Sequence, residues 1–445
     1  MSVRLTALSI ALVVAVAVAG AQTRTLTLEE ATKIALVRNL NVVQAENNAS
    51  SSESSVLAAY GRYLPNLSAS GSWTRTQMEG PIYTQGVAIP GSNAKQTTGS
   101  YSAGLSAGLT LFDGFDREAN LNRAQSMSDA TEHTLVRTKQ SIVFQVESSY
   151  LNVLRQEQLV KVSEENLKRD RRQLERIVES NRVGALSLAD VYRQQSQVAS
   201  DELNLINAQN SFDKANADLV ALIGLNVADE YRFADATIST TLDSTELIAV
   251  RTKYRDLGVL THTALTARPD LLGAKENLDA SESSVTIARS NYFPSLSAAA
   301  GLSGNNAEFG RLFDYKTIYW GLRLNWTLFD GFATNQAIQS AAANKRNAEI
   351  SVAQAERNIS VEMKKALLDL DAAMKQYEVS QKGLTSATED RKIAEERYNL
   401  GAGTLLDLLV ASAGFVSAEA NVVNASYNYV IAKRNVEYVL GERTY

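Results

Sequence analysis

The chain has 445 residues, a net charge of −5 at pH 7, no cysteine and only two histidines. A chain without cysteine has no disulfide, no thiolate metal site and no cysteine nucleophile, and an acidic balance without a basic block argues against nucleic acid as a partner. His133 and His262 lie far apart without an acidic cluster, and no Gly-rich phosphate loop or nucleophile elbow occurs. We therefore predict no catalytic residue, no cofactor and no metal site, and we do not expect an enzyme.

The first 21 residues have the pattern of a secretory signal peptide. Arg4 precedes an apolar stretch at residues 7–19, which is too short to cross a bilayer, and small residues follow it. We predict cleavage after Ala21; a membrane anchor is the alternative. Beyond this segment we find no uninterrupted apolar run of membrane-helix length, so we expect any entry into a membrane to use β-strands.

The pentapeptide Leu-Phe-Asp-Gly-Phe occurs twice, at residues 111–115 and 328–332. The same offset of 217 positions places Asp190 on Asp407 and a Val-Gly-Ala segment on a Leu-Gly-Ala segment. Farther upstream the offset is 229, because the first copy has twelve additional residues before the pentapeptide, where a longer loop would absorb them. The sequence therefore predicts an internal two-fold repeat.

The repeat sets the predicted organisation of the chain. We expect a first repeat at residues 22–225, a linker or equatorial segment at residues 226–260 and a second repeat at residues 261–445. Each repeat is expected to run through a helix, two membrane strands, a long helix, a tip turn and a return helix. Length alone would suggest about three domains, but the repeat favours one intertwined body.

Alternating stretches follow the first helix of each repeat, which we expect to end near a Tyr-Leu-Pro or Tyr-Phe-Pro break. They predict strands at about 65–78 and 99–112 in the first copy, with a Pro/Gly-rich segment between them, and at about 294–304 and 316–329 in the second. One face of each strand is apolar and the other is rich in Ser, Gly and Thr, which is typical of outer-membrane β-barrels. A soluble hairpin with one buried face is the alternative.

Long helices are predicted after each pentapeptide, over about 65–70 residues and about 100 Å at 1.5 Å per residue. Apolar and small residues repeat there at alternating spacings of four and three, which is a coiled-coil signal. In the second copy this seam comprises Ile359, Met363, Ala366, Leu370, Ala373, Tyr377, Ser380, Leu384 and Ala387. The corresponding seam of the first copy ends at Asp170, which stands opposite Ala387 in the alignment of the repeats.

A glycine turn ends each long helix, and a second helix follows it. Gly184 and Gly401 can supply the C-caps. The next helices can be N-capped by a hydroxyl residue with an aspartate three positions later, in a pattern like a capping box: Ser187 with Asp190, and Thr404 with Asp407. Helix capping alone would explain all of these residues.

Four membrane strands per chain cannot close on themselves, and lipid does not tolerate an open sheet edge. Two chains would supply eight strands and three would supply twelve. An eight-stranded barrel is filled by its own side chains, whereas small and polar inward faces suit an open lumen. The predicted fold is therefore a membrane α+β protein: a trimeric twelve-stranded β-barrel continued by a long periplasmic α-helical coiled-coil barrel.

The duplicated strand, pentapeptide and long-helix unit, the Tyr-Leu-Pro approach and the paired glycine tips resemble the TolC-like outer-membrane efflux family, the outer membrane factors. The resemblance covers essentially the whole mature chain. It implies a homotrimeric channel-tunnel in the bacterial outer membrane that extends into the periplasm. Its partners would be outer-membrane lipid, a periplasmic adaptor (membrane fusion) protein and an inner-membrane pump, and its cargo drugs, metal ions or secreted polypeptides.

The resemblance also implies roles for tip residues. Those expected to dock the adaptor are Gly184, Leu186, Ser187, Leu188, Gly401, Thr404 and Leu405. Asp407 falls at the position of an aspartate that lines the pore constriction, and Asp190 is expected to cap its helix. Val410 stands one turn after Asp407, at a position for a second acidic ring, so a double acidic constriction is not implied.

The predicted function is a passive exit duct of a tripartite efflux or type I secretion system. The alternative is a structural periplasmic coiled-coil protein that tethers envelope layers and has no conducting lumen. Strands with inward Ser and Gly disfavour the tether, because a tether needs no lumen. Single-channel conductance in a planar bilayer separates the two.

Overall fold

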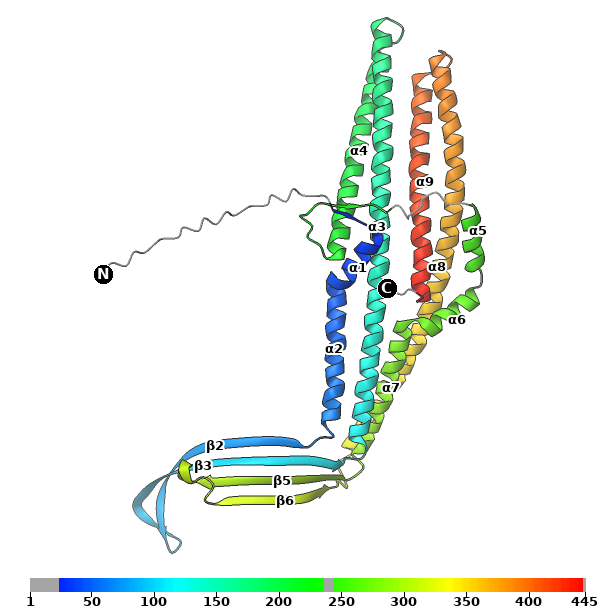
Figure 1. Cartoon of the computed structure of the whole chain (residues 1–445). Helices are drawn as coiled ribbons and strands as arrows, with labels where there is room; N and C mark the ends of the chain where they lie inside the picture. Colours follow the sequence, from blue (N-terminus) through cyan, green and yellow to red (C-terminus); the bar gives the residue numbers. More distant parts are fainter. Residues whose placement is uncertain (1–23, 236–243, 443–445) are drawn as a thin grey trace, which may run out of the picture. The chain divides into compact units, whose positions relative to one another are not determined.

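The structure, a computed structural model, describes residues 24–235 and 244–442 (Figure 1). The predicted signal peptide lies outside these residues, as does part of the predicted linker. Two compact units interleave along the chain: one contains Ile142–Lys253 and Asp369–Asn435, and the other contains Asn41–Ser141 and Tyr254–Leu368. The residues up to Leu40 belong to the first unit and those from Val436 to the second, so each unit takes segments from both predicted repeats.

An antiparallel sheet of four strands belongs to the second unit, in the order β2-β3-β5-β6. Its strands are β2 (Asn66–Thr84), β3 (Val87–Phe112), β5 (Ser295–Asn306) and β6 (Lys316–Asn325). Sequential pairing of neighbouring strands leaves β2 and β6 at the two edges. Both edges therefore carry backbone groups that are not paired within the chain.

The structure differs from the sequence prediction between the first two strands. Residues 79–99 were expected as a Pro/Gly-rich connection, but β2 and β3 stay paired until Thr84 faces Val87 across a two-residue turn with positive φ at Gln85 and Gly86. A register shift follows Pro81. Proline is tolerated here because the outer part of this hairpin is a two-stranded ribbon, where a missing N–H need not break a ladder.

Alternation gives the sheet one strongly apolar face, most clearly on β6. Every side chain of β6 is exposed, and Trp320 is exposed to 85%. The other large apolar side chains that alternate along this strand are Ile318, Leu322 and Leu324. On the opposite face the Tyr319 ring covers Gly301, its cross-strand partner on β5. The sheet thus presents apolar side chains that are not covered within the chain.

The two pentapeptides make the same junction between sheet and helix. Gly114 and Phe115 have φ of 68° and 71°, and the equivalent Gly331 and Phe332 have φ of 66° and 70°. In each copy the two phenylalanines of the pentapeptide pack edge to face, with ring centroids 5.7 Å apart. A non-glycine residue with positive φ costs of order 1 kcal/mol or more. The backbone geometry therefore supports the repeat inferred from sequence.

Each junction leads into one long helix, α3 (Asp116–Arg182) or α8 (Ala333–Asn399), but the two are secured differently. In the first copy the buried Arg117 donates to the Asp113 carboxylate at 2.9 Å and to the Thr110 carbonyl at 2.7 Å. In the second copy Thr334 occupies the equivalent position, and its backbone N–H donates to the Asp330 carboxylate at 2.7 Å. The aspartate of the pentapeptide accepts the securing hydrogen bond in both copies.

The first unit contains a small parallel pair, β1 (Arg24–Leu26) with β4 (Tyr231–Phe233). The fully buried Tyr150 of α3 donates its hydroxyl to the Leu26 carbonyl at 3.0 Å and packs edge to face on Phe233. Helix α1 (Leu28–Arg38) packs beside α4 (Leu188–Ile223), and α5 (Ser244–Lys253) follows the pair in the chain. Residues remote in sequence thus enclose α3 at this level of the unit.

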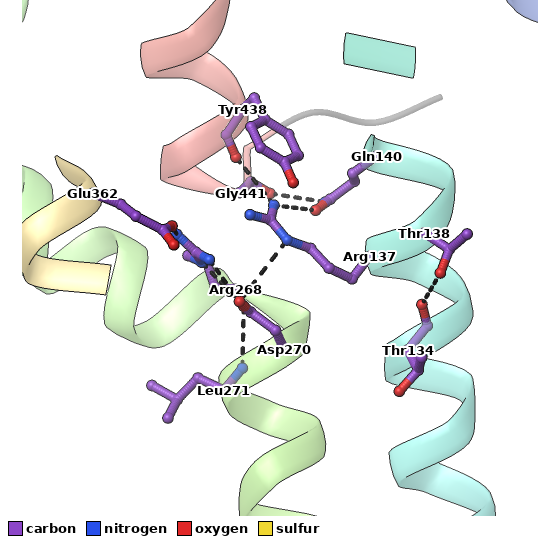
Figure 2. Close-up of polar contacts among 10 residues, drawn as sticks. All are labelled: Thr134, Arg137, Thr138, Gln140, Arg268, Asp270, Leu271, Glu362, Tyr438 and Gly441. Atoms are coloured by element: carbon purple, nitrogen blue, oxygen red, sulfur yellow. Dashed lines mark hydrogen bonds and ion pairs between the residues drawn. The ribbon is translucent and has the colours of Figure 1, made fainter. Parts of the chain in front are cut away.

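The second unit also contains α2 (Leu40–Gly61), α6 (Leu257–Ala267), α7 (Pro269–Ser290), a 3₁₀ turn η1 (Phe309–Arg311) and the end of α9 (Leu405–Leu440). A cluster of charges joins α3, α7, α8 and the end of α9 around Arg268 (Figure 2). Arg268, 3% exposed between α6 and α7, pairs with Asp270 and with Glu362 of α8. Arg137 of α3 lies 4.0 Å from the centre of the Tyr438 ring and donates to the Tyr438 carbonyl at 3.2 Å. The cluster therefore fixes the end of α9.

Among the described residues there is one helix, α9, that is long enough and apolar enough to cross a membrane, judged by its length and composition alone. From the sequence we expected no uninterrupted apolar run of membrane-helix length after the signal peptide, and Asp407 and Glu419 do interrupt the apolar sequence of α9. In the first unit the buried residues of α9 recur three and four positions apart: Leu405, Leu408, Ala411 and Phe415. This spacing is that of a helix packed against other helices.

Candidate functional site

The two glycine turns at the helix tips have the same geometry. In the first turn the Ala185 N–H donates to the Ser180 carbonyl and the Gly184 N–H to the Asn181 carbonyl, both at 2.9 Å. This pattern, with φ of 78° at the glycine, is a Schellman C-cap. Among the described residues, apart from its chain neighbours, no atom lies within 4 Å of a Cβ added at Gly184. Backbone conformation, not lack of space, therefore requires glycine there.

The second turn repeats that arrangement. The Ala402 N–H donates to the Arg397 carbonyl at 2.8 Å, and the Gly401 N–H donates to the Tyr398 carbonyl at 3.1 Å. Gly401 has φ of 72° and open space around its added Cβ. The Arg397 guanidinium also donates to the Ala402 carbonyl at 3.3 Å. Both tips are therefore built by local hydrogen bonds that leave the glycine on the surface.

Each return helix begins with a hydroxyl residue that bonds an aspartate. In α4 the Asp190 N–H donates to Ser187 Oγ at 3.2 Å, and the Ser187 hydroxyl donates to the Asp190 carboxylate at 2.7 Å. In α9 the Asp407 N–H donates to Thr404 Oγ1 at 3.2 Å. The Thr404 N–H donates back to the Asp407 carboxylate at 3.0 Å, which makes this start a reciprocal capping box with Asp in place of Glu.

Asp407 is exposed in the single chain, and its carboxylate serves the cap. Hydrogen bonds from the Thr404 backbone and hydroxyl hold the pKa of Asp407 below its usual range, and Arg397 adds to this effect. The carboxylate is therefore ionised at neutral pH. Asp190 likewise accepts a hydrogen bond from Arg193 at 3.2 Å.

The leucines of the tips point to different surroundings. Leu405 is buried and packs with Ile177 of α3 and Val191 of α4 in a small apolar cluster. Leu186, from the first turn, packs against the same cluster, together with Leu174, Tyr398 and Leu409. In contrast, Leu188 is 56% exposed. The structure thus joins the two tips through Leu186 and Leu405, whereas Leu188 is free to contact another molecule.

Further exposed apolar side chains surround the turns and were not proposed as site residues from sequence. They are Val183, Tyr192, Leu400, Leu406 and Val410. Exposure of large apolar groups close together marks interaction surfaces. Their positions beside Gly184 and Gly401 are the sequence signal that could have identified them, because a turn directs neighbouring side chains outward.

Among the described residues, no group of three or more His, Asp or Glu side chains is placed to hold a metal ion. The polar groups that do converge at the tips are capping pairs. Their chemistry is that of helix ends and of a charged surface.

Sequence and structure comparisons reveal relatives of this chain. The family described as outer membrane efflux protein matches residues 31–225 and 260–442. TtgC of Pseudomonas putida, a probable efflux pump outer membrane protein, is 24% identical over 421 residues, which are 93% of this chain and 82% of that protein. The outer membrane protein TolC of Vibrio cholerae is 22% identical over 350 residues, which are 76% of each chain.

The fold also has a solved counterpart. The crystal structure of the outer membrane protein VceC from Vibrio cholerae matches with a TM-score of 0.76 at 19% identity. The match covers 93% of this chain and 96% of that chain. The helix-rich α+β fold described above is thus the fold of VceC.

Proposed function

Because the chain belongs to the outer membrane efflux protein family, we propose that it is the passive exit duct of a tripartite efflux or type I secretion system. It is a protein of the bacterial outer membrane and extends into the periplasm. In this role the chain provides a path and performs no chemistry. The energy for transport comes from an inner-membrane pump.

The open sheet is the observation that carries this proposal. β2 and β6 are edge strands of a four-stranded sheet whose apolar side chains are exposed, Trp320 and Leu322 among them. Unpaired backbone N–H and C=O groups cost several kcal/mol each in lipid. The edges must therefore pair with those of other copies, and three copies make a closed barrel of twelve strands.

The composition of the other face supports a lumen. Ser68 and Ser106 face each other across β2 and β3, with their hydroxyls 2.7 Å apart, and Ser72 and Ser102 repeat the arrangement. Small hydroxyl residues leave space inside a barrel of this size and tolerate water. In the trimer, α3, α4, α8 and α9 of each copy continue the duct as a periplasmic helical barrel.

The tips are the proposed adaptor-docking surface. Gly184, Ser187 and Leu188 in the first tip and Gly401 and Thr404 in the second are exposed or lie beside exposed apolar side chains. Leu186 and Leu405 support them from the apolar cluster beneath. The adaptor would bury the exposed leucine and the side chains that surround the turns.

Asp407 is the proposed constriction residue. Its carboxylate is exposed, ionised and placed at the first turn of α9. Three-fold symmetry would turn this residue into a ring of three carboxylates if the tips converge on the axis. Such a ring attracts cations and sets the selectivity of a pore. Val410, one turn later, supplies an apolar rim instead of a second acidic ring.

Single-channel recording of the purified full-length protein in a planar lipid bilayer tests the function. We expect discrete conductance steps from particles whose mass in detergent is that of three chains. A trimer that inserts but never conducts, including after removal of the Asp407 charge by Asp407→Asn, would contradict the duct and support the envelope tether.

A further inference from the structure

Two buried carboxyl groups face each other between α3 and α4. Asp170 is 8% exposed and Asp201 is 2% exposed, and the residues next to them, Arg171 and Glu202, form an ion pair at 2.7 Å, which places the two aspartates at the same level of the hairpin. The Gln197 amide donates to Asp201 Oδ1 at 3.1 Å. Gln194, which is fully buried, donates its amide to the Asp170 carbonyl at 3.2 Å. α3 and α4 therefore contact each other here through polar side chains, at a level where a coiled-coil seam would have apolar side chains.

Two ionised carboxylates have no proton to donate, so a hydrogen bond between them requires that one be protonated. Like charges this close cannot both ionise at ordinary cost. Burial, and then the hydrogen bond and charge of Asp170, raise the pKa of Asp201 to about 7. Asp201 Oδ2 is buried and has no hydrogen-bond partner among the described residues. A proton on one of the two carboxyls would give this atom a hydrogen-bond partner and remove the repulsion between the two charges.

One cation, the guanidinium of Arg169, acts on the carboxyl pair of Asp170 and Asp201. Arg169 of α3 acts to lower the pKa of Asp201, as does the hydrogen bond from Gln197. The Arg169 guanidinium also lies 3.5 Å from the Glu419 carboxylate of α9 and 5.4 Å from the centre of the Phe415 ring. Arg169 is therefore shared between the carboxyl pair and α9.

The remaining charges from the packed helices are engaged elsewhere. Arg391 of α8 lies 4.1 Å from the centre of the Phe415 ring. Glu202 of α4 pairs with Arg171 of α3 at 2.7 Å on the exposed side. These groups leave Arg169 as the cation that acts on the buried carboxyls.

A cavity lies beside Asp170 at this level of the hairpin. It has a volume of about 850 Å³ and is lined by groups from α3, α4, α8 and α9, Asp170 and Gln194 among them. Gln194 Oε1 is buried there without a hydrogen-bond partner among the described residues. A proton can therefore reach Asp170 through the cavity without unfolding of the hairpin.

The second repeat builds the same hairpin without any of these groups. The offset of 217 positions carries Asp170, Gln194, Gln197 and Asp201 onto Ala387, Ala411, Gly414 and Ala418. Small apolar residues therefore suffice where α8 and α9 correspond to α3 and α4. The polar set in the first hairpin costs stability whenever both carboxyls are ionised, so packing does not explain its presence.

We propose that Asp170 and Asp201 form a proton-binding site in which one shared proton joins α3 to α4. When the proton is bound, the carboxyls are held by a hydrogen bond and the hairpin is closed at this level. When the proton leaves, two carboxylates repel each other and compete with Glu419 for Arg169. The first hairpin then loosens near its tip, whereas the second, with alanines, does not respond to pH.

Hydrogen exchange of the full-length detergent-solubilised protein, read by mass spectrometry from about pH 5 to about pH 8.5 and corrected for intrinsic rates, tests the site. The pKa of Asp201 is raised to about 7 in the closed hairpin and returns toward its ordinary value when the hairpin opens. Peptides that contain Asp170 or Asp201 should therefore lose protection by about tenfold per pH unit as the pH rises toward about 7, and their protection should level off above it. Peptides that contain Ala387 or Ala418 should keep theirs in the same sample.

Asp201→Asn removes the titration and keeps a donor for Asp170, so its exchange should be independent of pH. Asp213→Asn is the matched control, because Asp213 accepts a hydrogen bond from Gln209 on the exposed side of the same helix and should leave the wild-type pH response intact. A pH response that persists in Asp201→Asn, or one absent from the wild-type hairpin, would overturn the proposal.

If Asp201→Asn fails to fold, the double variant Asp170→Ala with Asp201→Ala copies the second hairpin and removes both carboxyls. Infrared spectra of the wild type near pH 6 should contain a protonated-carboxyl band that this double variant lacks. An identical band in both proteins would place the proton elsewhere and also refute the site.

Discussion

Replacement of Arg268 by methionine should destabilise the second unit, although Arg268 is not one of the proposed docking residues. Its guanidinium donates to Asp270 at 3.0 and 2.5 Å and to Glu362 at 2.6 Å (Figure 2). Burial acts to lower the pKa of Arg268, but these hydrogen bonds outweigh burial and raise it. Arg268 is thus a charged residue at the meeting point of α6, α7 and α8.

The magnitude follows from what methionine leaves behind. Breaking a buried ion pair costs about 3–5 kcal/mol. The Asp270 and Glu362 side chains are 38% and 48% exposed and can recover part of their hydration. Arg137, 3.9 Å from Asp270, compensates in part. We therefore expect a loss of about 2–3 kcal/mol in the free energy of unfolding.

Urea unfolding of the full-length protein in detergent measures this loss. Arg251→Met is the matched control, because Arg251 pairs with Glu378 at 3.6 Å and both side chains are about half exposed. Such a surface pair contributes about 0–1 kcal/mol. If Arg268→Met lowers the free energy of unfolding no more than Arg251→Met does, burial does not determine how much this cluster contributes to stability.

The other predictions concern the tips and the strand junction. Gly184→Pro or Gly401→Pro should abolish transport while the trimer still assembles, because proline cannot adopt the positive φ of either turn. Normal efflux by both variants at normal protein levels would show that the turns are ordinary helix caps. Asp407→Asn should weaken block by divalent or trivalent cations added from the periplasmic side in planar bilayers, and unchanged block would leave Asp407 with its capping role alone. Thr404→Ala should lower the free energy of unfolding by about 1 kcal/mol, because the N-cap of α9 is lost. The melting temperature should fall with it, and an unchanged melting temperature would count against the capping box.

Local signals explain what could be predicted from the sequence. The tip turns depend on a glycine and on a hydroxyl residue three positions before an aspartate, and these rules act within one turn of helix. The pentapeptide is a local signal of the same kind, because Gly114 and Phe115 adopt positive φ and the equivalent Gly331 and Phe332 repeat it. Family membership follows from these motifs together with their duplication.

Contacts between distant segments explain what could not be predicted. Asp170 and Asp201 are 31 positions apart, and only the register of α3 against α4 makes them neighbours. The ion pair between Arg268 and Glu362 spans 94 positions. The continuation of β2 and β3 through residues 79–99 was missed because proline and glycine normally indicate a loop, whereas a two-stranded ribbon tolerates them.

The central claim is that the open sheet closes by association of three chains, and the native mass of the full-length protein in detergent tests it most directly. Because the chain has no cysteine, single cysteines introduced along β2 and β6 can report edge pairing in the same preparation. We predict the mass of three chains, with disulfide cross-links that join β2 of one copy to β6 of another. A stable monomer or dimer without such cross-links would contradict the account.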